Sequence, residues 1–214
     1  MFALRPTWTP RIHKQKRERY PVTIDLDQHK NALFGDPRSV RVKAYHCTRA
    51  IRGDIASSGL KKFDLEERIQ YLDGVLMASG LSRGLLDDYF FEVRRFISGQ
   101  NLIGREGKIC FCLNRALFED DDGCDKLFRY FGGEALYKLA VHMPKFGEVR
   151  EALEAIGEPL VITASIPLNA MLPFQSDRVR RYLSGESSEC CEAFIDVDVP
   201  PSDIMEIEVC NKNL

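Results

Sequence analysis

The alternation of apolar and polar residues is clearest near the end of the chain, between residues 192 and 209. Every second residue from Ala193 to Val199 is small or aliphatic, and this period of two is typical of a strand with one buried face. Pro200-Pro201 interrupts the pattern, and residues 204–209 are again rich in aliphatic side chains with a less regular spacing. The stretch therefore predicts strand, turn, strand, with Glu192 at the mouth of the first strand.

Three further segments have the pattern of strands. Residues 39–48 alternate, with aliphatic side chains on one face, and residues 107–114 form a continuous apolar run between a glycine and an asparagine. A continuous run of this length is typical of a strand that is buried on both faces. Residues 160–168 are rich in β-branched side chains and predict a third strand.

Apolar residues at helical spacing separate these strands. Residues 50–60 predict a short helix that Gly59 ends. Asp64, with Glu67 three residues later, forms a capping-box pattern with Asp as the cap, and Ser82 can cap the next helix. Further apolar patterns predict helices at residues 146–157 and 177–183, and either a helix or a strand at residues 134–139.

The predicted elements follow one another as β-α, α-α, β, α, β, α, β-β. Strands do not alternate regularly with helices, and no glycine-rich phosphate loop follows the first strand. This order favours an α+β fold over a doubly wound sheet. The 214 residues are enough for one sizeable core. We expect residues 1–36 to form an N-terminal arm and residues 37–214 to form a single domain.

Charge is distributed unevenly along the chain. The net charge is −2, so no overall field draws the protein to nucleic acid or to a membrane. Within the first twenty residues, however, lysines and arginines face a single acid, Glu18, while residues 119–122 are all acidic. The basic arm is interpreted either as a solvated tail or as a segment that contacts a phosphate backbone.

Cysteine usage and hydropathy narrow the class of protein. The chain has 7 cysteines, an odd number, and no pair in the CxxC spacing. This argues against a disulfide framework and against a zinc site, and we expect no metal. No apolar run approaches the ~20 residues of a membrane span, and no secretory signal begins the chain. A reducing cytoplasm is the expected compartment.

Three side chains are candidates for chemistry. Glu192 lies where a loop enters a strand, a place where rigid scaffolds often hold catalytic groups, although a solvated strand-end charge is the simpler explanation. Glu134 follows two glycines and competes for the same role, although an acid in the first turn of a helix is stabilising by itself. His46 ends the first predicted strand, where it either binds a ligand or is satisfied by backbone.

Three of these stretches, in this order, resemble motifs of the ADP-ribosyltransferase superfamily. Tyr45-His46-Cys47-Thr48, with the short helix and Gly59-Leu60 behind it, resembles the first motif, in which a His-x-Thr ends strand one. Residues 107–111 resemble the second strand motif. Glu192-Ala193-Phe194-Ile195, with Pro200-Pro201 and the strand after it, resembles the third motif, which begins with the catalytic glutamate. This third motif is most similar to that of the DarT-type toxins, which modify nucleic acid.

The resemblance implies a fold, a co-substrate and a set of site residues. The implied fold is α+β, with a split antiparallel or mixed β-core flanked by helices, and the implied co-substrate is NAD. Glu192 would stabilise the positive charge that develops on the ribose when nicotinamide leaves, with the logic of a glycosidase carboxylate. His46 and Thr48 would contact ribose hydroxyls, and the backbone around Tyr45 and His46 would hold the nicotinamide amide.

The sequence departs from the family pattern at Cys110, where many relatives have a tyrosine. The resemblance then leaves stacking on nicotinamide to Phe111 or Tyr130, and it favours single transfer over polymer formation. In relatives the loop before the catalytic strand selects the acceptor. Glu189 in that loop would position or deprotonate the acceptor; the alternative is that Glu189 is simply an exposed side chain. Arg178 and Arg181 border that loop and would contact a phosphate-bearing acceptor, unless they form a solvated helix face.

The expected function is that of an NAD-dependent mono-ADP-ribosyltransferase, a toxin or antiviral effector, that modifies a macromolecule. The basic arm and the third motif favour a nucleic acid, RNA or DNA, slightly over protein, and such a toxin implies a neutralising antitoxin. Two alternatives stay open. One is a non-catalytic module that binds ADP-ribose or nucleic acid. The other is an RNA 2′-phosphotransferase, which shares the fold and depends on arginines rather than on a glutamate.

Overall fold

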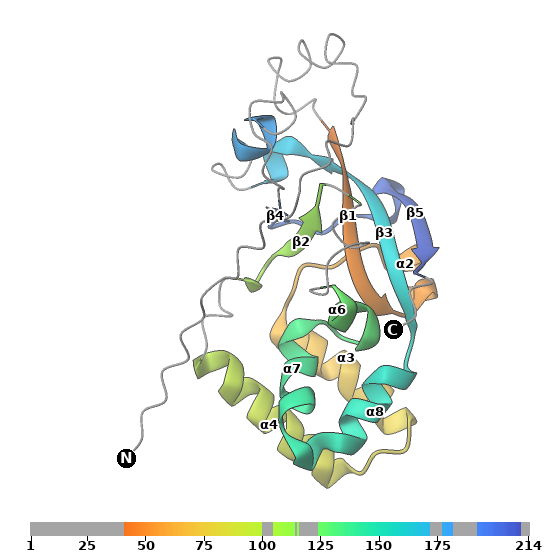
Figure 1. The fold of residues 1–214 in the computed structure, drawn as a ribbon, viewed down its shortest axis with the longest axis vertical. Coiled ribbons are helices and arrows are strands. Elements are labelled where there is room, and N and C mark those ends of the chain that lie inside the picture. The colour runs from red at the N-terminus through yellow and green to blue at the C-terminus, as the bar shows by residue number, and fades with distance from the viewer. Residues whose placement is uncertain are drawn as a thin grey trace, which may run out of the picture.

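The computed structural model describes residues 41–99, 105–113, 115, 124–171, 177–181 and 192–210. The arm expected at residues 1–36, the acidic run at 119–122 and the acceptor-loop residue Glu189 lie outside these residues. Figure 1 shows the described part as a sheet above a group of helices.

The sheet has five strands in the order β4-β2-β1-β3-β5. Each pair of neighbouring strands in it is antiparallel. The α+β expectation is therefore confirmed, and the sheet is antiparallel rather than mixed. The strands are β1 (Arg41–Ala50), β2 (Ile109–Cys112), β3 (Glu158–Pro167), β4 (Glu192–Ile195) and β5 (Ile204–Val209).

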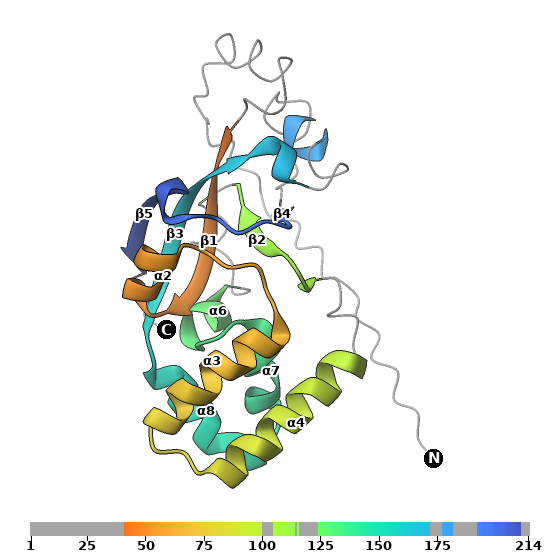
Figure 2. The same ribbon diagram turned by 180° about the vertical axis from the view of Figure 1, so that it is seen from behind.

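The two strands of the C-terminal stretch do not pair with each other. β4 lies at one edge of the sheet beside β2, and β5 lies at the other edge beside β3. The strand predicted to reach Val199 ends at Ile195 instead, which corrects the sequence prediction. The reason is that Val199 exchanges two backbone hydrogen bonds of 2.9 Å with Leu60, behind the sheet. The chain between the two strands therefore crosses the back of the sheet, as Figure 2 shows.

The helices begin and end close to the predicted signals. The Glu67 backbone N–H donates to Asp64 Oδ1 at 2.9 Å, which confirms the predicted cap. Gly59 ends the first short helix with a φ of 73°, a conformation that favours glycine. The helices are α2 (Arg52–Ser58), α3 (Leu65–Ala78), α4 (Arg83–Gly99), α6 (Asp125–Arg129), α7 (Glu134–His142) and α8 (Gly147–Ala155). Residues 177–181 are also helical, and 3₁₀ turns cover Pro144–Phe146, Leu168–Ala170 and Pro201–Asp203.

The helical core forms between α3, α4, α7 and α8. Tyr89 lies at its centre, fully buried, with its ring centroid 5.2 Å from that of Phe146. Its hydroxyl donates to the carbonyl oxygen of Leu136 at 2.5 Å, so burial leaves this polar group satisfied. Burial raises the pKa of Tyr89 above its ordinary value. The predicted apolar stripes of α3 and α4 face this core, because their periodic leucines and aromatics are the residues that it buries.

The two faces of the sheet differ in what covers them. Because side chains alternate along a strand, neighbouring residues lie on opposite faces. We call the α2 face the one that carries Ala44 and Phe111, against which Ile55 of α2 packs. We call the α6 face the one that carries Cys47 and Val161, which pack on Phe128 of α6. Figures 1 and 2 look at these two faces in turn.

Candidate functional site

Alternation along β1 divides the candidate residues of the first motif between the two faces. Tyr45 packs beside the Cys47 cluster and therefore lies on the α6 face. His46 contacts Phe111, with ring centroids 5.7 Å apart, and therefore lies on the α2 face. Thr48, two residues further along, shares the face of His46. Tyr45 and His46 therefore cannot contact the same part of a ligand through their side chains.

On the α2 face, a hydrogen bond to the backbone determines which ring nitrogen of His46 carries the proton. Its Nδ1 atom lies 2.8 Å from the carbonyl oxygen of Cys110. A carbonyl oxygen only accepts, so Nδ1 carries the proton and Nε2 keeps its lone pair. Burial lowers the pKa of His46 below its ordinary value; the hydrogen bond to Cys110 acts in the opposite direction, and the charge of Arg68 adds to the lowering. His46 is therefore a neutral ring whose Nε2 can accept a hydrogen bond from a hydroxyl group.

Arg68 on α3 is the cation whose charge lowers the pKa of His46. The side chain is half-buried, and burial lowers the pKa of its guanidinium. Among the described residues, no carboxylate forms an ion pair with it, although seven of the other described arginines have such a partner. The charge of Glu67 favours the guanidinium but does not outweigh the effect of burial, and a bound anion would offset the remaining cost.

On the α6 face, the sheet register places Glu192. Glu192 pairs with Cys112 of β2, and Cys112 pairs with Tyr45 of β1. Directly opposed residues share a face, so the three side chains form a row, with Tyr45 and Glu192 about 10 Å apart at their Cα atoms. Glu192 is exposed at the edge of the sheet, and no described side chain forms an ion pair with it. It is therefore on the opposite face from His46, its expected partner.

Glu134, in the first turn of α7, lies within electrostatic reach of Cys110 in β2. It forms ion pairs with Arg105 and, at 3.6 Å, with Lys138. The pKa of Cys110 is raised to about 11, mainly by burial; the charge of Arg105 opposes this rise, and the charges of Glu192 and Glu134 contribute to it. Two carboxylates that are distant in the sequence, one paired and one unpaired, therefore lie around a single thiol.

Tyr137 of α7 lies beside this group. Burial raises the pKa of its hydroxyl to about 12, and Glu134 contributes in the same direction. The neutral phenol is therefore a hydrogen-bond donor at neutral pH. The group contains one unpaired carboxylate (Glu192), one carboxylate that is ion-paired with an arginine (Glu134 with Arg105), and one phenol that donates a hydrogen bond (Tyr137). We refer to these four residues as the carboxylate site.

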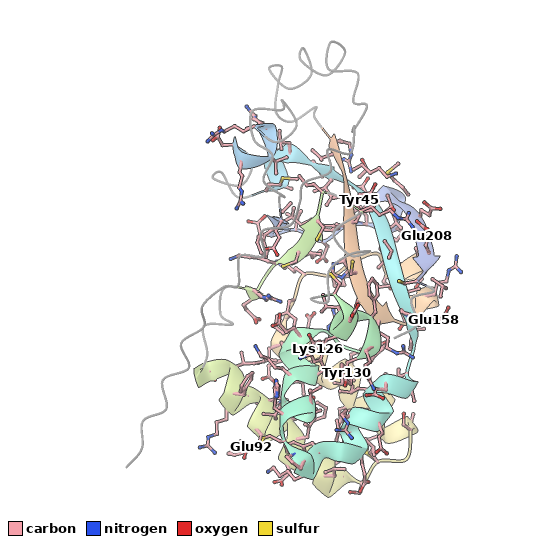
Figure 3. The ribbon with its side chains drawn as sticks, in the orientation of Figure 1. Tyr45, Glu92, Lys126, Tyr130, Glu158 and Glu208 are labelled. Carbon is pink, nitrogen blue, oxygen red and sulfur yellow. The ribbon has the colours of Figure 1, made fainter. Side chains whose placement is uncertain are left out.

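Neither of the two rings expected to stack on nicotinamide is exposed. The Phe111 side chain is 2% exposed, between His46 and the strands beside it. Tyr130 is 6% exposed and lies in the helical core, 5.2 Å from the ring of Tyr137. Figure 3 shows Tyr130 beside the helices and Tyr45 on the sheet above them. Neither ring therefore offers an open face to a ligand in this structure, whereas Tyr45, on the face of Glu192, is half-buried.

The residues expected to contact the acceptor are only partly described. Arg178 and Arg181 are both exposed, on the helical segment 177–181, and Val179 between them is buried. Sequence reasoning missed Arg68 and Arg105. Both are single basic residues in ordinary polar positions, and nothing in the local pattern distinguishes them, because their importance comes from what lies next to them in space.

Comparison of the chain with protein-family models, with curated proteins and with solved structures finds no match. Across the described residues, no group of three or more His, Cys, Asp or Glu side chains is arranged to hold a metal ion. The same part of the chain has no helix of the length and apolarity that a membrane crossing needs.

Proposed function

We propose that this protein is an NAD-dependent mono-ADP-ribosyltransferase whose reaction centre is the carboxylate site on the α6 face. One observation carries the proposal. Glu192 is an exposed carboxylate with no ion pair among the described residues, and Glu134, ion-paired with Arg105, acts electrostatically on the same thiol, Cys110. The order of the strands, with the strand of Glu192 next to β2 and β2 next to β1, suits the motifs that resemble the ADP-ribosyltransferases.

The two carboxylates have different parts in this proposal. When the bond between ribose and nicotinamide breaks, positive charge develops on the ribose, and an unpaired carboxylate beside it lowers the barrier. Glu192 has this role, because nothing in the described structure neutralises it. Glu134, positioned by Arg105 and Lys138, accepts the proton of the attacking acceptor group. Tyr45, which pairs with Cys112 and shares the face of Glu192, contacts the nicotinamide end of NAD.

The acceptor is a macromolecule, and we favour a nucleic acid over protein. The support is the basic N-terminal sequence and the likeness of the third motif to nucleic-acid-modifying toxins, both of which are sequence arguments. A toxin of this class would require a neutralising partner in the same cell. Arg178 and Arg181 are the exposed cations that we assign to acceptor binding.

Nicotinamide release from NAD tests the proposal. It should be measured with purified protein in the presence of RNA, DNA or total cell protein. Glu192→Gln should lower the rate by at least ~10²-fold, because the neutral amide no longer stabilises the cation. Glu206→Gln is the matched control, since Glu206 is exposed on the same face but pairs with Thr163 on the far side of β1. A rate that survives Glu192→Gln but is lost in Glu134→Gln would move the reacting carboxylate to α7.

His46 and Arg68 favour a second candidate function, the binding of ADP-ribose or of a nucleic-acid segment without chemistry. A neutral Nε2 acceptor beside an unpaired guanidinium suits a ligand that carries both hydroxyls and a phosphate. Calorimetric titration with ADP-ribose separates the two functions. Binding lost in Arg68→Gln but kept in Arg95→Gln, an exposed control, together with no nicotinamide release, would support the binding module.

Release of a 2′-phosphate from RNA, insensitive to Glu192→Gln, would support the phosphotransferase instead.

A further inference from the structure

Cysteines that are distant in the sequence converge on the α6 face. They pack around Phe128 of α6 and Val161 of β3, and they come from β1, from β2, from the residue after β5 and from the residue before α6. Each of the others raises the pKa of the buried Cys47, so they lie within electrostatic reach of it. The members of this thiol cluster are Cys47, Cys112, Cys124 and Cys210.

Within the thiol cluster, Cys47 and Cys124 form a specific pair. A hydrogen bond joins their side chains, and it is the largest cause that raises the pKa of Cys47 far above its ordinary value, with burial second. Cys47 is 8% exposed, whereas Cys124, immediately before α6, is half-buried. The proton therefore stays on the buried sulfur, which donates to the more accessible one. Of the two sulfurs, that of Cys124 is therefore the one more open to solvent.

A metal does not account for this cluster, because the described cysteines are not arranged as a set of three or more metal ligands. All five described cysteines are thiols. Two thiols in hydrogen-bond contact, one accessible and one buried behind it, are the arrangement in which oxidation of the first is resolved by the second.

We propose that Cys124 is a peroxide-sensitive thiol and that Cys47 is its resolving partner, so that oxidation joins β1 to the start of α6 by a disulfide. In the first step the Cys124 sulfur attacks hydrogen peroxide, the O–O bond breaks, and a sulfenic acid and one water form. In the second step the Cys47 sulfur displaces the hydroxyl of the sulfenic acid, which leaves with the thiol proton as a second water. Two thiols and one peroxide thus give one disulfide and two waters.

The position of the pair gives the disulfide a structural effect. α6 packs directly on β1 and β3, and Tyr45 packs against the same thiol cluster. A covalent link would hold this contact closed and would constrain the long segment between residues 47 and 124 in the unfolded chain. The oxidised protein should therefore unfold at a higher temperature than the reduced protein, by about 5 °C or more. This inference does not depend on the proposed function.

Peptide mapping tests the proposal on the full chain. The protein is treated with hydrogen peroxide, its remaining thiols are blocked with N-ethylmaleimide, and it is digested with trypsin without reduction. Trypsin places Cys47 and Cys124 on peptides 44–49 and 116–126, each with a single cysteine. The expected product is the disulfide between these two peptides. Its absence, or a product that joins either of them to another cysteine instead, would overturn the proposal.

Variants assign the two roles. Cys47→Ala should leave Cys124 as a sulfenic acid that dimedone labels, whereas Cys124→Ser should give neither the cross-link nor the label on peptide 44–49. Cys210→Ser is the matched control, because Cys210 belongs to the same cluster but does not share the hydrogen bond, and it should leave the cross-link unchanged. If the buried Cys47→Ala variant fails to fold by circular dichroism, dimedone labelling of the wild type at short times after peroxide addition replaces it. Label on Cys47 rather than on Cys124 would contradict the assignment.

Discussion

The Nδ1 atom of His46 lies 2.8 Å from the carbonyl oxygen of Cys110, so the hydrogen bond joins β1 to β2 through a side chain. It also determines which ring nitrogen carries the proton. Because burial lowers the pKa of His46, the ring stays neutral in the folded protein at neutral pH. The same contact thus contributes to the sheet and leaves an acceptor on the α2 face.

This relationship predicts a pH dependence of stability. The folded-state pKa of His46 is below the value of about 6.5 in the unfolded chain, so the unfolded chain binds more protons between the two values. The contribution is fully present above the unfolded pKa and is lost as the pH falls through it toward the folded pKa. Urea unfolding between pH 5 and 8 should show a loss of at most about 1.4 kcal/mol per pH unit from this group. His46→Gln should remove that part of the slope, and an unchanged slope would show that other groups cause it.

Gly59 predicts a large effect of a small substitution. Its φ is +73°, and an added Cβ would lie 2.0 Å from the carbonyl oxygen of Val199. Gly59→Ala should therefore lower the free energy of unfolding by at least about 3 kcal/mol, from backbone strain together with the clash. Gly80→Ala is the control, because Gly80 has a φ of +89° but no atom within 4 Å of the added carbon. It should cost about 1 kcal/mol, and equal losses in the two variants would contradict the role of the close contact.

The cap of α3 predicts a graded loss. Asp64→Ala removes the acceptor of the Glu67 N–H and should lower the free energy of unfolding by about 1 kcal/mol. Asp64→Ser keeps a capping oxygen and should lower the free energy of unfolding by only a few tenths of about 1 kcal/mol. Chemical denaturation of the two variants beside the wild type measures both. Two indistinguishable losses would show that the charge of Asp64, rather than its hydrogen bond, stabilises the helix.

Thr163 predicts a stabilising substitution. Its side chain is 1% exposed, and its Oγ1 has no hydrogen-bond partner among the described residues. A buried hydroxyl without a partner is destabilising, so Thr163→Val should raise the free energy of unfolding by about 1 kcal/mol. Ser165→Ala should do the opposite, because Ser165 Oγ accepts from Arg41 Nε at 2.9 Å. If Thr163→Val destabilises the protein, an ordered water satisfies the hydroxyl.

If the proposed activity is found, Arg105→Gln tests which of the two carboxylates, Glu192 or Glu134, lies beside the ribose. Its guanidinium is about half exposed and pairs with Glu134, so its contribution is that of a surface ion pair, within about 1 kcal/mol. Arg105→Gln should then lower nicotinamide release by less than about tenfold, well below the effect of Glu192→Gln. A larger loss in Arg105→Gln than in Glu192→Gln would identify Glu134, not Glu192, as the carboxylate beside the ribose.

The sequence alone determined the local elements of this protein. Asp64 and Glu67 predict the start of α3, the apolar spacing of residues 86–97 predicts the buried face of α4, and Gly59 predicts the end of α2. These signals are local, because a cap, a helical period or a left-handed glycine depends on residues within one or two turns. The alternation in β1 is local in the same way, and it already separates Tyr45 from His46.

Only the tertiary structure decided which elements meet. Nothing near Glu192 in the sequence shows that its strand pairs with β2, that β5 lies at the opposite sheet edge, or that Val199 leaves the predicted strand to pair with Leu60. Strand order and register depend on packing over the whole chain, since many pairings satisfy the same alternation. The contact of Cys47 with Cys124 and the influence of Arg68 on His46 have the same origin: each joins residues whose local patterns are ordinary and whose closeness exists only in the folded chain.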